Sequence, residues 1–179
     1  MEYDVILDVP DVYLDDKEWN HYNDILKQSG IKTYVDLFRE RPYLTESCFN
    51  NFLIILPTGI ELLTNVVHYP AAYDAIKLTI VDFAHRICKK SGWHKTSDSM
   101  PHITLETKYN RLHVPIPRII SVENFSEYME VIKTAIQSIS HMQKEKCVEF
   151  IFDIDEGFQY GKLRTFEEYG AKYRMPGKT

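Results

Sequence analysis

The sequence predicts an α+β fold with a mainly antiparallel sheet and helices packed on one face of it. Two observations support this prediction. Two short apolar runs joined by a turn lead into a long amphipathic segment, and this arrangement occurs twice, over Phe52–Cys88 and His102–Met142. Each copy is typical of a β-hairpin followed by a helix, a ββα unit. The chain has 179 residues and no low-complexity linker, which indicates one domain over residues 1–179.

The N-terminal part, Tyr3–Ser29, is predicted to form a strand followed by a helix. Asp15 and Glu18 have the spacing of a capping box, and apolar residues then recur at helical spacing as far as Ser29. The next segment, Ile31–Phe38, alternates as a strand would, but Thr33 can also cap a short helix. Because Asp36 is the third residue after Thr33, we favour the helix.

The first ββα unit is predicted from a continuous apolar run and a turn signal. Phe52–Leu56 is apolar throughout, Pro57–Gly59 has turn chemistry, and Ile60–Val67 is again rich in Leu and Val. Pro70 suits the first position of the helix that follows, and Gly92 suits its end. This part of the chain should therefore form a buried hairpin and a long helix.

The second ββα unit has strands over His102–Lys108 and Arg111–Pro117, and Asn124 and Glu127 are spaced to cap its helix. After it, Cys147–Ile154 alternates as a late strand of the same sheet, a short element follows over Leu163–Tyr169, and the tail is loose. Four positions on the apolar stripes of the two long helices are expected to be buried: Ile76, Phe83, Ile132 and Ile136.

The composition limits the classes of partner. The net charge is −5, from 26 acidic and 21 basic residues, which disfavours direct nucleic-acid binding and binding to anionic membranes. A basic protein partner fits this charge. Cys48, Cys88 and Cys147 are dispersed, which suits free thiols in a reducing compartment. Neither a signal peptide nor an apolar run of membrane-spanning length is visible, so we expect a cytoplasmic location.

One motif suggests chemistry. In Pro101–Glu106, His102 and Thr104 alternate on one face of the predicted strand, where an imidazole can exchange a proton and a hydroxyl can bind phosphate. This string resembles one motif of the two-histidine phosphoesterase family, and the resemblance implies action on cyclic phosphates or RNA ends. The family needs a second such motif tens of residues away. The nearest candidate, His94–Thr96, starts only eight positions earlier and lacks the central apolar residue.

The predicted hairpin brings four polar residues together. If Tyr109 and Asn110 form a two-residue turn, Glu106 faces His113, and one face of the hairpin carries His102, Thr104, Glu106 and His113. This set could cleave a phosphodiester by general acid and base catalysis. The alternative, which we favour, is that the face is simply solvated, because an antiparallel sheet with helices on one side has a wet opposite side.

The seven histidines form no HxH or HExxH pattern, and no cysteine has metal-ligand spacing, so we expect no metal and no cofactor.

A second candidate site is acidic. Carboxylates and aromatic rings are interspersed in one stretch and would suit a surface that attracts and then buries against a basic protein: Asp153, Asp155, Glu156, Phe158 and Tyr160. In its size, acidity and lack of catalytic motifs the chain resembles the immunity proteins of bacterial toxin systems. The sequence thus predicts a protein-binding inhibitor, for example of a nuclease toxin. The alternatives are a phosphodiesterase or RNA-processing enzyme, and a structural subunit of a larger assembly.

Overall fold

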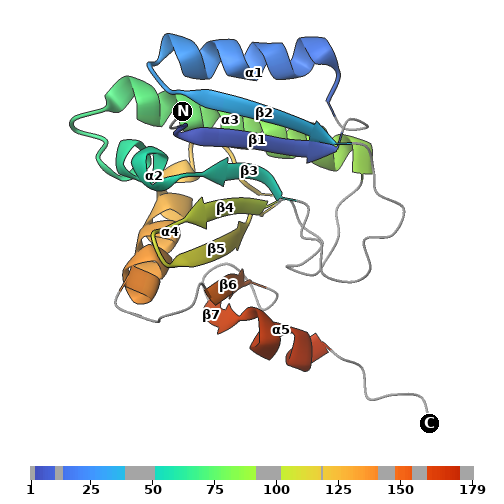
Figure 1. The fold of residues 1–179 in the computed structure, drawn as a ribbon, viewed down its shortest axis with the longest axis vertical. Helices are drawn as coiled ribbons and strands as arrows, with labels where there is room; N and C mark the ends of the chain where they lie inside the picture. Colours follow the sequence, from blue (N-terminus) through green and yellow to red (C-terminus); the bar gives the residue numbers. More distant parts are fainter. Residues whose placement is uncertain are drawn as a thin grey trace.

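The structure, a computed structural model, describes residues 3–10, 14–38, 51–91, 102–117, 119–140, 148–154 and 161–173. The described residues form seven strands and five helices (Figure 1). In chain order these elements are β1 (Val5–Pro10), α1 (Asp16–Gln28), β2 (Thr33–Phe38), β3 (Asn51–Ile55), α2 (Pro57–Thr64), α3 (Pro70–Ser91), β4 (His102–Glu106), β5 (Asn110–Pro115), α4 (Phe125–Ser140), β6 (Val148–Asp153), β7 (Lys162–Thr165) and α5 (Phe166–Tyr173).

All seven strands belong to one sheet in the order β2-β1-β3-β4-β5-β6-β7. The predicted α+β class is confirmed, but the sheet is mixed rather than mainly antiparallel. The pairs β1–β2, β3–β4 and β5–β6 are parallel, and the pairs β1–β3, β4–β5 and β6–β7 are antiparallel. The reason is that α1, α3 and α4 each carry the chain across the sheet between two neighbouring strands, which makes those strands parallel.

β4 and β5 pair as a hairpin and α4 follows them, which is the order of elements predicted for the second ββα unit. The prediction of the first ββα unit is wrong. β3 ends at Ile55, and Pro57 begins a helix instead of a turn. The backbone N–H of the first helical residue has no partner within the helix, and proline lacks this N–H. Pro57 therefore suits the start of a helix as well as a turn. Gly59 lets the helix approach the start of β1 closely, since a Cβ there would clash with the carbonyl oxygen of Asp4.

The segment that follows α1 is a strand, so the helix favoured for Ile31–Phe38 is also wrong. Thr33–Phe38 pairs in parallel with β1 along its whole length, and this pairing outweighs the local capping signal at Thr33. The late strand predicted over Cys147–Ile154 is confirmed as β6, and the short element predicted over Leu163–Tyr169 corresponds to the end of β7 and the start of α5.

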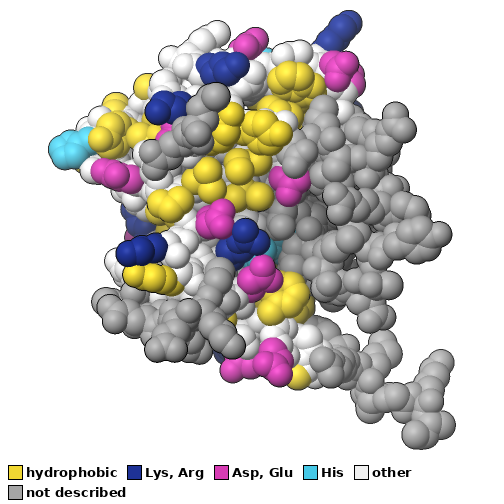
Figure 2. Space-filling view, viewed as in Figure 1, with side chains coloured by type: hydrophobic (Ala, Val, Ile, Leu, Met, Phe, Trp, Pro, Cys, Tyr) yellow, Lys and Arg dark blue, Asp and Glu magenta, His cyan; other side chains and the backbone are white. Residues whose placement is uncertain are grey.

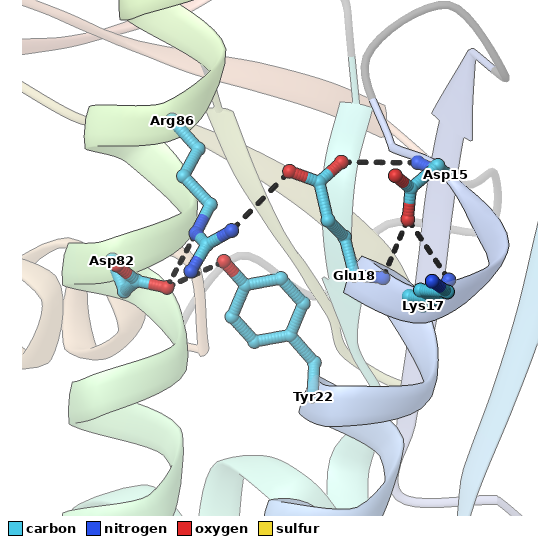
Figure 3. Close-up of polar contacts among 6 residues, drawn as sticks. All are labelled: Asp15, Lys17, Glu18, Tyr22, Asp82 and Arg86. Carbon is cyan, nitrogen blue, oxygen red and sulfur yellow. Dashed lines mark hydrogen bonds and ion pairs between the residues drawn. The ribbon is translucent and has the colours of Figure 1, made fainter.

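The capping box that predicted α1 is present. The Asp15 carboxylate accepts the backbone N–H of Glu18 at 2.9 Å, and the Glu18 carboxylate accepts that of Asp15 at 3.0 Å. Figure 3 shows how the same region joins α1 to α3. The Tyr22 hydroxyl donates to the Asp82 carboxylate at 2.6 Å, and Arg86 binds both Asp82 and Glu18. Burial and the bond to Asp82 raise the pKa of the Tyr22 phenol, so this tyrosine stays neutral and remains a donor.

The helices α3 and α4 cover one face of the sheet; α3 runs behind the strands in Figure 1. α1 packs on α3 through an edge contact between the Tyr22 and Phe83 rings. The apolar side chains of β1 and β3 to β6 point into this layer. Of the four helical positions predicted to be buried, Ile76, Phe83 and Ile132 are buried, and Ile136 is partly buried against the core. None of the described helices is long and apolar enough to span a membrane.

The short helix α5 lies on the opposite face of the sheet, which we call the outer face. Its first residue, Phe166, has its ring against His113, and the Lys172 ammonium binds the carboxylate of Asp153 on β6. The prediction that helices pack on one face therefore does not hold for α5.

Candidate functional site

One row of residues crosses the outer face from edge to edge. Strand registers align these residues, and because side chains alternate along a strand, aligned residues point to the same side. From β2 to β7 the row reads Tyr34, Ile6, Ile54, Thr104, His113, Ile151 and Arg164. We call the part over β1 to β3 the open half, and the part over β4 to β7, where α5 lies, the clasped half.

The clasped half contains the polar set predicted from the hairpin. The register pairs Thr104 with His113, and Glu106 with Arg111. The predicted register, with Glu106 opposite His113, is thus wrong by two residues. The turn lies one residue earlier than predicted, because Lys108 and Tyr109 separate Thr107 from Asn110, and the Thr107 backbone N–H donates to the Asn110 carbonyl at 2.8 Å. A shift of two residues keeps every side chain on its face, so His102, Thr104, Glu106 and His113 still share one side.

This polar set is not the solvated surface that we expected. His102, Thr104 and His113 are 0%, 2% and 3% exposed. The Phe166 ring lies edge-on to His113 with its centroid 5.8 Å away, so α5 supplies part of the cover. The sequence places α5 more than fifty residues after His113, and no local pattern in the hairpin reveals that contact.

The buried pair Thr104–His113 has the geometry of a hydrogen-bonded hydroxyl and imidazole. Thr104 Oγ1 lies 2.9 Å from His113 Nδ1. Burial, and to a smaller extent the positive charge of Arg111, lower the pKa of the His113 imidazole to about 4. His113 is therefore neutral at pH 7, and its low pKa makes it a weaker base than an ordinary imidazole. Glu106 does not assist it directly, because its carboxylate binds the Arg111 guanidinium at 3.1 Å.

Asp153 was predicted at a partner-binding surface, but its side chain is only 3% exposed. One carboxylate oxygen, Oδ2, accepts Arg164 Nε at 2.7 Å and Lys172 Nζ at 2.8 Å. These two cations lie in the C-terminal part of the chain, for which the sequence predicted only a short element and a loose tail, so sequence reasoning missed them. The other predicted partner-binding residues, Asp155, Glu156, Phe158 and Tyr160, lie outside the described residues.

The open half has the opposite character. Tyr34 is 46% exposed, and its ring lies 5.3 Å, centroid to centroid, from that of Tyr3. Ile6 and Ile54 continue the row and are only partly buried. Figure 2 shows hydrophobic side chains gathered over this part of the molecule, with acidic side chains at the border. The sequence did not reveal this surface, because Tyr34 lies in the segment for which we favoured a helix.

Charge at the open half is acidic near the edge of the sheet. On the outer face Asp8 follows Ile6 along β1, so a carboxylate lies next to the apolar side chains of the open half. Among the described residues, no group of three or more His, Cys, Asp or Glu side chains is arranged to hold a metal ion.

No family model, curated protein or solved structure gives a significant match to this chain.

Proposed function

We propose that this chain is a protein-binding module that inhibits a basic protein, in the manner of the immunity proteins that neutralise bacterial nuclease toxins. The observation that carries the proposal is the apolar surface of the open half, where Tyr34 is exposed and its neighbours are partly exposed. Tyr34, Tyr3, Ile6 and Ile54 form a contiguous aromatic and aliphatic area on a sheet face. Exposed apolar patches of this kind mark interaction sites, and tyrosine is enriched in the buried centre of protein interfaces.

The charge of the chain supports a basic partner. The net charge is −5, and Asp8 of β1 lies beside the apolar patch on the outer face. Carboxylates at the border of an interface attract a basic protein over long range and accelerate association, while the apolar centre holds the complex after contact. This surface lies at a different place from the acidic stretch predicted around Asp153. In both cases carboxylates attract the partner and apolar side chains hold it.

An enzymatic role has one supporting observation, the Thr104–His113 hydrogen bond, which matches a nucleophile beside its base. Both groups are almost completely buried, so a substrate could reach them only after their cover, of which α5 is a part, moves. We therefore expect no hydrolysis of a 2′,3′-cyclic nucleotide or of bis(4-nitrophenyl) phosphate. Hydrolysis by the wild type that disappears in His113→Gln would replace the proposal with a phosphodiesterase.

Site-specific photo-cross-linking tests the proposal. A photoreactive amino acid is placed at position 34 in one preparation and at position 109 in another, because Tyr34 and Tyr109 are 46% and 47% exposed and only Tyr34 lies on the patch. We expect position 34 to capture a basic protein from the native host, and position 109 not to capture it. The two purified proteins should form a stoichiometric complex that abolishes the activity of the partner.

Two results would contradict this function. An acidic partner would remove the electrostatic argument, and a partner that remains fully active in the complex would point instead to a structural subunit. Equal capture from positions 34 and 109 would show that the open half is not the interface.

A further inference from the structure

The helix α5 contacts the clasped half through side chains at its start, middle and end. The Phe166 ring lies on His113, Lys172 binds Asp153 at 2.8 Å, and Tyr169 is buried. α5 has eight residues and is the last described element of the chain, and Figure 1 shows it beside β7, away from the other helices. It is therefore the described helix that can leave the sheet with the least disturbance to the rest.

The surface beneath α5 lowers the cost of such an opening. It includes the polar side chains of His113 and Asp153, whereas α3 and α4 cover an almost wholly apolar face. When polar groups meet water they regain hydrogen bonds, but apolar groups do not. Local opening occurs preferentially where few apolar contacts are lost, so α5 should open without unfolding the sheet.

Asp153 also shows what chemistry this surface can accept. Its buried carboxylate already holds a guanidinium from β7 and an ammonium from α5 on the same oxygen. Arg164 belongs to the sheet, so it stays in place if α5 leaves, but Lys172 departs with the helix. The departure leaves room at Asp153 Oδ2 for one cationic group from elsewhere, and arginine and lysine side chains are the groups that a basic protein presents.

We propose that α5 is a displaceable clasp, and that the position of Lys172 on Asp153 is a binding site for an arginine or lysine side chain of the basic protein partner. Lys172 is then an internal competitor for that side chain. The identity of the partner rests on the proposed function, but the clasp itself does not. Both halves of the outer face would contact the same partner, the open half at once and the clasped half after α5 is displaced.

Hydrogen exchange of the intact chain tests the clasp without any partner. We expect the amides of α5 to exchange through an opening that leaves α3 and α4 protected. Lys172→Met should accelerate exchange in α5 by about tenfold, because it removes a charge-assisted bond. Lys133→Met is the matched control, since it removes a lysine that pairs with Glu130 on α4. Exchange of α5 and α3 at one common rate, with the same response to denaturant, would refute the clasp.

A nona-arginine peptide tests the cation site. Lys172→Met and Lys133→Met change the net charge equally, so long-range attraction affects both variants alike. We expect Lys172→Met to bind the peptide at least about fivefold more tightly than Lys133→Met, because only the former vacates Asp153. Adding Asp153→Asn to Lys172→Met should remove this gain. Equal affinities of the two lysine variants would overturn the cation site, while a partner captured at position 34 and inhibited would leave the proposed function intact.

Discussion

Tyr34 and His113 lie on the same face of one sheet and in the same register row, but their surroundings are inverted. The aromatic Tyr34 is 46% exposed, and the polar His113 is 3% exposed. Exposure on this face is therefore set by whether another element covers a strand, and the polarity of the side chain does not decide it. Elements that lie far away in the sequence provide that cover, as α5 does at His113.

The inversion has a different physical consequence in each half. In the clasped half, buried polar groups are bonded to one another, as in the Thr104–His113 pair and in the ion pairs of Asp153. Removing one member leaves the other buried without its partner, which is costly. In the open half an apolar side chain already meets water, so removing it changes stability little. Substitutions in the clasped half should therefore mainly lower the stability of the fold, and substitutions in the open half should mainly weaken binding.

The largest effect is expected at Asp153. Asp153→Ala leaves Arg164 and Lys172 without their shared carboxylate, and losing one member of a buried ion pair costs roughly 3–5 kcal/mol. We expect a value near the lower limit, because the two cations are 26% and 28% exposed. Urea unfolding measures the change. The control Glu130→Ala breaks an exposed pair with Lys133 and should cost less than about 1 kcal/mol. Equal losses for both variants would mean that Asp153 contributes no more than a surface charge.

The second effect is a pH dependence that originates at His113. Its pKa is about 4 in the folded chain and near the ordinary 6.5 when unfolded. Because the folded pKa is depressed, the neutral imidazole stabilises the fold above pH 6.5, and this stability is lost as the pH falls from 6.5 toward 4. Between pH 7.5 and pH 4.5 the loss should be on the order of 2–3 kcal/mol.

Other groups also titrate in this range, so the measurement is a difference between two proteins. Urea unfolding of the wild type and of His113→Gln at both pH values isolates the contribution of the imidazole. The free energy of unfolding of the variant should fall less on acidification than that of the wild type. Identical pH dependence in both proteins would contradict a buried neutral His113.

A smaller effect is expected at Thr104. Thr104→Val keeps the shape of the side chain but removes the hydroxyl from His113 Nδ1, and an unsatisfied buried nitrogen costs about 1–2 kcal/mol. Thr134→Val removes an exposed hydroxyl that bonds only to the backbone of its own helix, and should cost less than about 0.5 kcal/mol. Denaturation midpoints of the two variants check this. If Thr104→Val proves as mild as the control, the hydrogen bond does not stabilise the clasped half.

The sequence predicted those features that depend on neighbouring residues. The capping box of Asp15 and Glu18 located the start of α1, and strict alternation located both strands of the β4–β5 hairpin and the face that their polar residues share. Prediction from the sequence failed where one residue is compatible with two local structures. Pro57 fits a turn and a helix start equally well, and an apolar run does not distinguish a buried strand from a buried helix.

The candidate site was harder to predict, because its character depends on contacts between distant segments. Nothing near His113 in the sequence indicates that Phe166 will cover it, and nothing near Asp153 indicates that Lys172 will bind it. The open half was missed for a related reason. Tyr34 reaches the outer face only because Thr33–Phe38 pairs with β1, and this parallel pairing is a non-local interaction that capping signals do not report.

The smallest effect on stability is expected at the open half, at Tyr34. Tyr34→Thr keeps a residue with good strand propensity and removes only an exposed ring, so the free energy of unfolding should change by less than about 0.5 kcal/mol. Binding to the protein captured at position 34 should nevertheless weaken by about thirtyfold or more, as expected for an aromatic residue at the centre of an interface. Tyr109→Thr, at an equally exposed tyrosine on the β4–β5 hairpin tip, should change neither quantity. A large loss of stability in Tyr34→Thr would mean that the ring supports the sheet. Unchanged binding would mean that the exposed apolar surface of the open half is not used for recognition.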